Sequence, residues 1–155
     1  MTGGSAAGRL GTTRVRVRYA ETDRMGVVYY ANYFVWFEVA RTDWLRDTGW
    51  SYRAMEAEGT TLPVIEAHCE YRRPAHYDDE LDVRTRATLL SPVRIRFDYE
   101  VARPQDAEPL ATGHTVHAAL DASGRPCRLP ARVRAMLAAH PVPPASTVYN
   151  TRLHD

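Results

Sequence analysis

The chain has 155 residues, of which 45% are hydrophobic and 25% charged, as in an ordinary globular domain with a substantial core. Its formal net charge of +1 argues against a nucleic-acid-binding protein, which usually carries a strong basic bias. Cys69 and Cys127 form no CxxC pair, so neither a disulfide scaffold nor a zinc site is expected. No apolar run is long enough for a membrane span, no signal peptide is visible, and we expect a cytoplasmic protein.

The N-terminal residues divide into a polar leader and a strand. Residues 1–13 consist mostly of Gly, Ser, Thr and Ala, which predicts a disordered leader. Residues 14–19, RVRVRY, alternate strictly and predict a short strand with one half-buried face. That face would carry Val15, Val17 and Tyr19.

A helix is predicted after a glycine-bearing connection at residues 20–31. From Asn32 onward, NYFVWFEVARTDWLRDTG places apolar side chains at helical spacing, and Asn32 is a suitable N-cap. Gly49 follows the expected end of the helix, where glycine commonly stops it. Because the helix is apolar on most of its sides, we expect it to be buried.

The remainder of the chain reads mainly as strands. Residues 51–59 predict a second, short helix that ends at Gly59. The hydrophobic period then falls to two, with turn residues between segments, which predicts four strands at 62–75, 80–90, 93–103 and 109–121. Residues 130–140 predict a terminal helix and 141–155 a flexible C-terminal tail, so the folded domain is expected at 14–140.

This order of elements predicts an α+β fold. One long helix would be wrapped by a five-stranded antiparallel sheet, since long neighbouring strands with short turns pair in that way. A single sheet over one helix leaves apolar surface uncovered. We therefore expect a homodimer or homotetramer in which an edge strand pairs across a two-fold axis.

One stretch has a specific resemblance. Residues 19–33, YAETDRMGVVYYANY, combine a carboxylate, a glycine, paired tyrosines and an asparagine at fixed spacing. Together with WFEVAR, CEYRRPAHYDDEL and GRPCRLP further on, this stretch closely resembles the 4-hydroxybenzoyl-CoA thioesterase family of acyl-CoA thioesterases, over residues 14–139. The resemblance implies a hotdog fold. It also implies hydrolysis of thioesters of coenzyme A or of an acyl carrier protein, with no metal and no organic cofactor.

The resemblance also implies roles for three residues. Asp23 matches the catalytic carboxylate, and Tyr30 matches the position whose backbone N–H polarises the thioester carbonyl at the entry to the helix. Tyr19 matches a tyrosine that lines the site. A large subgroup of the family has histidine at the position of Tyr30, so only the role of the amide carries over. Asp23 could act as a general base toward water or as a nucleophile, and the sequence does not choose between them.

Plainer interpretations of these residues stay open. Asp23 could be only a turn former. Glu21 is a rival carboxylate, because residues two apart in an extended segment share a face, and the preference for Asp23 rests on the resemblance. Asn32 is most simply the helix cap, although it could also orient the loop or contact substrate. For Glu38, an ion pair with Arg41 is favoured over catalysis.

Basic side chains are the expected contacts for the phosphates of coenzyme A. Guanidinium forks suit phosphate, and we expect such contacts from the same or a neighbouring subunit, at Arg94, Arg96, Arg125 and Arg128. His114 and His117 face opposite sides of a strand, and His68 and His76 show no ligand spacing, so no metal site is expected.

Two other functions are considered. The first is a non-catalytic module that binds acyl-CoA, but such a protein has no need of Asp23. The second is a hotdog hydratase or dehydratase. Resemblance to those enzymes would imply an Asp and His pair at the start of the central helix. No histidine precedes His68, so this second function is disfavoured.

Overall fold

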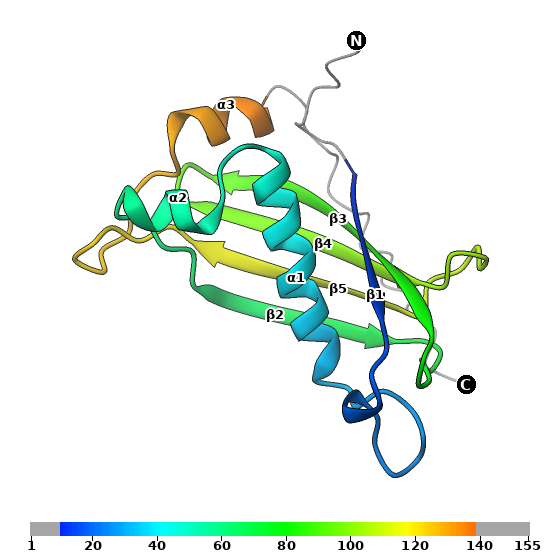
Figure 1. Ribbon diagram of the computed structural model, residues 1–155. Helices are drawn as coiled ribbons and strands as arrows, with labels where there is room; N and C mark the ends of the chain where they lie inside the picture. The colour runs from blue at the N-terminus through cyan, green and yellow to red at the C-terminus, as the bar shows by residue number, and fades with distance from the viewer. Residues whose placement is uncertain (1–9, 139–155) are drawn as a thin grey trace, which may run out of the picture.

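One five-stranded antiparallel sheet and a layer of helices make up residues 10–138, the part of the chain that the computed structural model describes (Figure 1). The strands lie in the order β1-β3-β4-β5-β2, and every neighbouring pair is antiparallel. The predicted α+β class and five-stranded antiparallel sheet are confirmed. The elements in chain order are β1 (Gly11–Arg16), the 3-10 turn η1 (Tyr19–Glu21), α1 (Asn32–Asp47), α2 (Tyr52–Ala57), β2 (Val64–Tyr71), β3 (Glu80–Ser91), β4 (Arg94–Ala102), β5 (Ala111–Ala118) and α3 (Ala131–Ala138).

The N-terminal predictions need correction. Residues 11–13 are not disordered, because they form the start of β1 and pair with residues 83–85 of β3. Tyr19 is not on the strand: β1 ends at Arg16, and Tyr19 lies in η1 with 79% of its surface exposed. The rest of the predicted leader and the predicted C-terminal tail lie outside the described residues.

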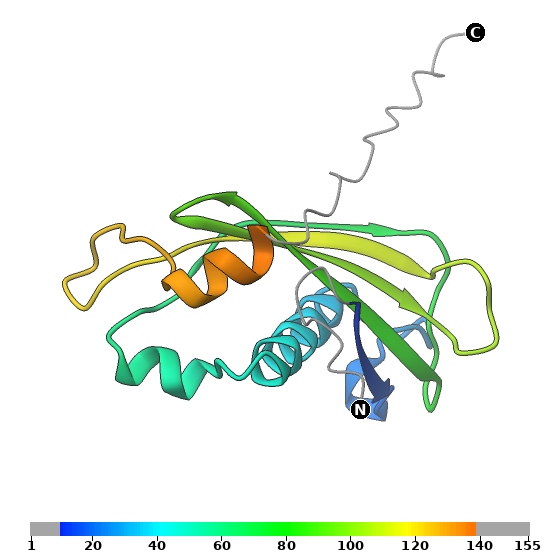
Figure 2. The same cartoon turned by 90° about the horizontal axis from the view of Figure 1, so that it is seen from above.

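Helix α1 packs on one face of the sheet, which curves around it (Figure 2). The contact is close where the ring of Phe37 stacks on Tyr99 of β4, with the centroids 4.2 Å apart and the planes at 4°. Beside this stack, a Cβ atom at Gly113 would lie 2.7 Å from the Phe37 ring and 2.5 Å from the His68 carbonyl oxygen. Glycine at this position of β5 therefore allows α1 to approach the sheet.

The boundaries of α1 are partly as predicted. Gly49, with φ of +83°, follows its C-terminal end, which confirms the predicted stop. The predicted N-cap is wrong: Ala31 occupies that position, and Asn32 is the first helical residue. The prediction of burial on most sides is also wrong for the single chain, because Val35 and Val39 are 49% and 41% exposed.

The remaining predicted elements are confirmed, mostly with shorter bounds. Strand β3 instead runs one residue further than predicted, to Ser91, and residues 139–140 of the last predicted helix lie outside the described residues. Both short helices form, and Ser51 begins α2 by accepting a hydrogen bond from the Ala54 N–H at 3.2 Å. The four predicted strands are β2 to β5. Within residues 10–138, no helix combines the length and the apolar character needed to cross a membrane.

A buried chain of polar groups lies between the sheet and its neighbouring segments. Burial raises the pKa of Tyr99 to about 12, so its hydroxyl stays protonated, and it lies 2.7 Å from the Thr115 hydroxyl. The Thr115 hydroxyl lies 2.9 Å from Nε2 of His117, whose Nδ1 lies 2.9 Å from the Leu62 carbonyl oxygen. A carbonyl can only accept, so Nδ1 carries the proton and Nε2 is free to accept from Thr115.

This chain predicts a loss of stability in mild acid. Burial lowers the pKa of His117 to about 4, whereas an unfolded histidine titrates near 6.5. The unfolded state therefore binds more protons between these values, and the free energy of unfolding falls as the pH drops from about 6.5 to about 4. By pH 5 the loss is about 2 kcal/mol.

Urea unfolding at pH 7 and pH 5 measures this loss. The His117→Gln variant should lose less stability between the two pH values than the wild type. The control is His68→Gln, because His68 is an exposed residue of β2. An equal pH dependence in wild type and His117→Gln would show that His117 is not the group that titrates.

Candidate active site

The loop between η1 and α1 folds back on itself in a tight turn. The Asp23 N–H donates to the Val27 carbonyl at 2.8 Å, and the Gly26 N–H donates to the Asp23 carbonyl at 3.0 Å. Gly26 has φ of +78°, a conformation that glycine adopts without strain. The loop is joined to the segment after β2, because the Val28 N–H donates to the Ala75 carbonyl at 2.9 Å.

Glu21 anchors this loop to α1. The residue is 5% exposed, and its two carboxylate oxygens accept from the Trp36 indole N–H at 3.0 Å and the Arg18 backbone N–H at 2.8 Å. Its backbone carbonyl accepts from the Tyr29 N–H at 2.8 Å and from Nδ2 of Asn32 at 2.9 Å. The rival carboxylate is thus occupied in a buried structural role, and the Asn32 amide holds the loop that leads to Asp23.

Asp23 combines a turn-forming contact with a position on a pocket. One carboxylate oxygen accepts from the Met25 N–H at 2.8 Å, which is an Asx turn, and no hydrogen bond within residues 10–138 occupies the other oxygen. Asp23 lines a pocket of about 340 Å³. The walls are largely aromatic and apolar, and include Val27, Val28, Tyr30, Tyr33, Tyr71 and Pro74.

Tyr30 lies on the same pocket, just before α1. Its carbonyl accepts from the Tyr71 hydroxyl at 2.8 Å, and its ring packs on that of Tyr29 with the centroids 4.6 Å apart. Its backbone N–H has no acceptor among the described residues. Amides at a helix N-terminus lack internal partners and carry the positive end of the helix dipole, so this N–H can donate to a ligand.

Two tyrosines of the pocket wall, Tyr33 and Tyr71, are neutral at physiological pH. Burial is the main cause that raises the pKa of both Tyr33 and Tyr71. The Tyr33 and Tyr71 rings meet edge to face with centroids 5.1 Å apart. They supply apolar surface and hydrogen-bonding hydroxyls, while Asp23 supplies the negative charge.

Both basic residues of the pocket were missed by the sequence predictions. Arg72 and Arg73 follow the end of β2 and line the pocket that Asp23 also lines. The signal was present in the CEYRRPAHYDDEL stretch, where a pair of basic residues precedes a proline at a strand end. Nothing in that local pattern indicates that the segment lies beside the loop of Asp23.

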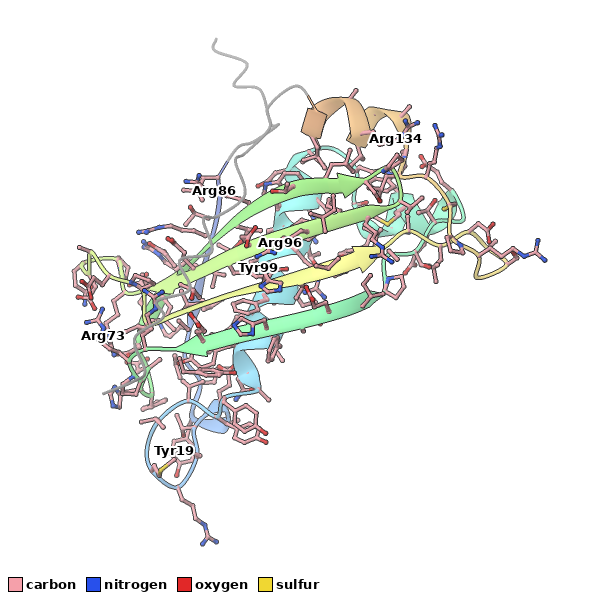
Figure 3. The ribbon with its side chains drawn as sticks, turned by 180° about the vertical axis from the view of Figure 1, so that it is seen from behind. Tyr19, Arg73, Arg86, Arg96, Tyr99 and Arg134 are labelled. Atoms are coloured by element: carbon pink, nitrogen blue, oxygen red, sulfur yellow. The ribbon has the colours of Figure 1, made fainter. Side chains whose placement is uncertain are left out.

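Several predicted site residues lie elsewhere. The Tyr19 ring does not line the pocket and contacts Tyr77 instead, with the centroids 5.9 Å apart. Figure 3 shows Arg96 on the sheet face that points away from α1, and its guanidinium pairs with Asp98 at 3.0 Å. Arg94 begins β4 opposite Ala118, at the far end of the sheet from the pocket. Arg125 and Arg128 are exposed in the segment between β5 and α3. The single chain does not bring these four arginines to Asp23.

The predicted ion pair between Glu38 and Arg41 is wrong. Glu38 is exposed on α1, and Arg41 is buried and donates from Nε to the Tyr52 hydroxyl at 3.3 Å. Neither residue lines the pocket. Residues 10–138 hold no cluster of three or more His, Cys, Asp or Glu side chains suited to a metal ion.

Comparison with known protein families places the chain in a known class. A sequence profile of the Thioesterase-like superfamily matches residues 17–139, and the chain belongs to this superfamily. The expected resemblance to the hotdog thioesterases is thereby confirmed.

Individual relatives agree with this class. YneP of Bacillus subtilis is 40% identical over 90 residues, which are 58% of this chain and 65% of YneP. The acyl-CoA thioester hydrolase YbgC of Escherichia coli O157:H7 is 36% identical over 92 residues, which are 59% of this chain and 69% of YbgC. The crystal structure of Slr0204, a 1,4-dihydroxy-2-naphthoyl-CoA thioesterase from Synechocystis, has a TM-score of 0.78 at 26% identity and covers 84% of this chain and 96% of that one.

Proposed function

We propose that the chain hydrolyses the thioester bond of an acyl-CoA, or of an acyl carrier protein, at the pocket beside Asp23. One observation carries this proposal: Asp23 and Tyr30 line one largely apolar pocket. Among residues 10–138, one carboxylate oxygen of Asp23 and the backbone N–H of Tyr30 have no hydrogen-bond partner. The superfamily and the names of the relatives support a thioester hydrolase. In this proposal α1 is the central helix of the hotdog fold, and its N-terminal end faces the thioester.

The proposed chemistry needs only these groups and water. In the general-base form, Asp23 takes a proton from water as the water oxygen attacks the thioester carbonyl carbon. The negative oxygen that develops accepts a hydrogen bond from the Tyr30 N–H, an interaction typically worth about 3 kcal/mol. Collapse breaks the C–S bond, and the proton passes to the thiolate. In the nucleophilic form, a carboxylate oxygen of Asp23 attacks instead, and the C–S bond breaks to give an anhydride and the thiolate. Water then hydrolyses the anhydride and supplies the proton that the thiolate takes.

The other predicted site residues enter the proposal in weaker roles. Asn32 holds the Glu21 carbonyl, so we assign it to keeping the loop in place beside the substrate. Tyr19 would contact substrate from outside the pocket of the single chain. Because Arg94, Arg96, Arg125 and Arg128 lie away from the pocket of their own chain, we assign their phosphate contacts to coenzyme A bound by a second copy.

A second copy would also cover the exposed apolar surface. Strand β2 is an edge of the sheet and exposes Val64 and Ile65, while α1 exposes Val35 and Val39. An edge strand with unpaired backbone groups is a template for pairing with another chain. We therefore propose a homodimer that pairs β2 with β2 of the second copy, with a homotetramer as the larger assembly. Cys69 and Cys127 are free thiols, in keeping with the proposed cytoplasmic location.

Thiol release from a panel of acyl-CoAs tests the hydrolase. The panel contains short, branched, long and aromatic acyl groups, each also presented on an acyl carrier protein. At least one thioester should be cleaved, with free thiol and acid formed in equal amounts. Binding of acyl-CoA without release from any member would favour the alternative, a non-catalytic acyl-CoA-binding module.

A further inference from the structure

Arg72 brings a positive charge to the pocket that the proposed chemistry does not use. Its backbone is fixed just beyond β2, where its N–H donates to the Leu110 carbonyl at 2.8 Å. Its exposed guanidinium has no hydrogen bond or ion pair within residues 10–138. The neighbouring Arg73 is occupied, because it donates from Nη2 to the Glu108 carbonyl at 2.8 Å and lies 3.8 Å from the Asp106 carboxylate.

The surroundings of Arg72 indicate whether the acyl group that it contacts is neutral or negatively charged. A neutral acyl chain needs only the apolar and aromatic walls of the pocket. A negatively charged acyl chain would be repelled by Asp23 and would lose its hydration, and both costs fall when a cation lies within reach. A guanidinium is well suited here, because its planar fork binds both oxygens of a carboxylate.

The size of the pocket indicates which part of an acyl-CoA it can hold. Asp23 and Arg72 line one pocket of about 340 Å³, at the lower end of the range for small-molecule sites. Asp23 must reach the thioester carbonyl. In coenzyme A the whole pantetheine arm separates that carbonyl from the phosphates, so a residue that lines the same pocket as Asp23 is placed to contact groups near the thioester and not the phosphates.

On the basis of the proposed hydrolase function, we propose that Arg72 is a specificity residue that binds a carboxylate on the acyl group. The favoured substrates are then thioesters of acids that carry a second, ionised carboxyl group. Asp23 either attacks the thioester carbonyl carbon or activates the attacking water at one end of the acyl group. Arg72 binds the carboxylate at the other end.

Paired substrates with and without a terminal carboxylate test this assignment. The pairs are pentanoyl and glutaryl thioesters, and benzoyl and 4-carboxybenzoyl thioesters, each made with coenzyme A and with N-acetylcysteamine, which lacks the nucleotide. The variants are Arg72→Gln and Arg72→Glu. The matched control is Arg53→Gln, because Arg53 is an exposed residue of α2 outside the pocket.

Arg72→Gln should lower kcat/KM for the carboxylated thioesters roughly 10- to 100-fold on both carriers, the size of a lost charge-assisted hydrogen bond. For the neutral thioesters, kcat/KM should stay within about twofold of wild type, because the substitution removes no contact to them. Arg72→Glu should reverse the preference, and Arg53→Gln should match wild type throughout.

Two results would overturn the assignment. One is a loss on every coenzyme A thioester but on no N-acetylcysteamine thioester, which would place Arg72 on the nucleotide phosphates. The other is no change in the charged-to-neutral ratio. If wild type cleaves nothing, the proposed hydrolase function is wrong. Calorimetric binding of non-cleavable glutaryl and pentanoyl thioether analogues then tests the role of Arg72 independently of hydrolysis. Tighter glutaryl binding that Arg72→Gln abolishes would support it, and equal binding would reject it.

Discussion

Asp23→Asn is expected to lower turnover of the best thioester roughly 10²- to 10⁴-fold, the range for loss of a general base. The substitution is nearly isosteric and removes the charge and the basicity together. The Asn side-chain oxygen can still accept from the Met25 N–H, so the Asx turn should survive. Thiol release at saturating substrate measures the loss, and thermal unfolding should show almost the same Tm as wild type.

Asp23→Ala separates the two roles of this carboxylate. Alanine removes the turn contact as well as the charge, so this variant should be as inactive as Asp23→Asn and less stable. If Asp23→Asn instead unfolded more easily and kept its turnover, Asp23 would be only a turn former. The carboxylate that attacks or activates water would then have to be sought elsewhere on the pocket.

Tyr30→Pro is expected to lower turnover by ~10²-fold or more, because proline has no backbone N–H to stabilise the oxyanion. The Tyr30 N–H has no acceptor within residues 10–138, so its removal breaks no hydrogen bond in this part of the fold. The effect should fall mainly on kcat, since the interaction strengthens as charge develops on the carbonyl oxygen. Steady-state kinetics on the best thioester give kcat and KM separately.

Tyr30→Phe is the matched control for the backbone. It keeps the amide and most of the ring, and loses only the hydroxyl that interacts with Tyr29. We expect turnover within a few-fold of wild type. A variant as inactive as Tyr30→Pro would assign the role to the side chain, and an active Tyr30→Pro of native stability would exclude the amide as the oxyanion donor.

Local patterns predicted the elements that their own residues specify. Gly49 ends α1 in the left-handed conformation, and Ser51 caps α2 with its hydroxyl. The strict alternation in β4 also survives in the structure, with Ile95, Phe97 and Tyr99 buried. These features depend on dihedral preferences and on period, which a single sequence displays.

Three of the failed predictions involve partners distant in the chain. Asn32 does not cap α1, because its amide binds the Glu21 carbonyl. Residues 11–13 are ordered because β3 offers them a partner strand, which their own polar composition does not reveal. Arg41 has an acceptor on α2, the Tyr52 hydroxyl, in place of the nearby Glu38. Tertiary contacts overrode the local preference in each case.

The candidate site shows the same division. The motif around Asp23 and Tyr30 is continuous in sequence, so the resemblance could indicate both residues, and their catalytic roles stay predictions. Arg72 reaches the pocket because its segment folds back beside the loop, where Ala75 accepts from the Val28 N–H. That approach joins residues far apart in sequence, and no local spacing encodes it.

The neighbouring acids Glu21 and Asp23 would respond to different selective pressures. Glu21 is buried, and its carboxylate accepts hydrogen bonds from the Trp36 indole N–H and the Arg18 backbone N–H, so its loss would reduce the fraction of folded protein. Asp23 contributes one turn contact that asparagine can replace. A mutant library sorted only by cellular abundance should therefore be depleted of changes at Glu21 and tolerant of asparagine at Asp23, whereas sorting by growth that depends on the activity would deplete both.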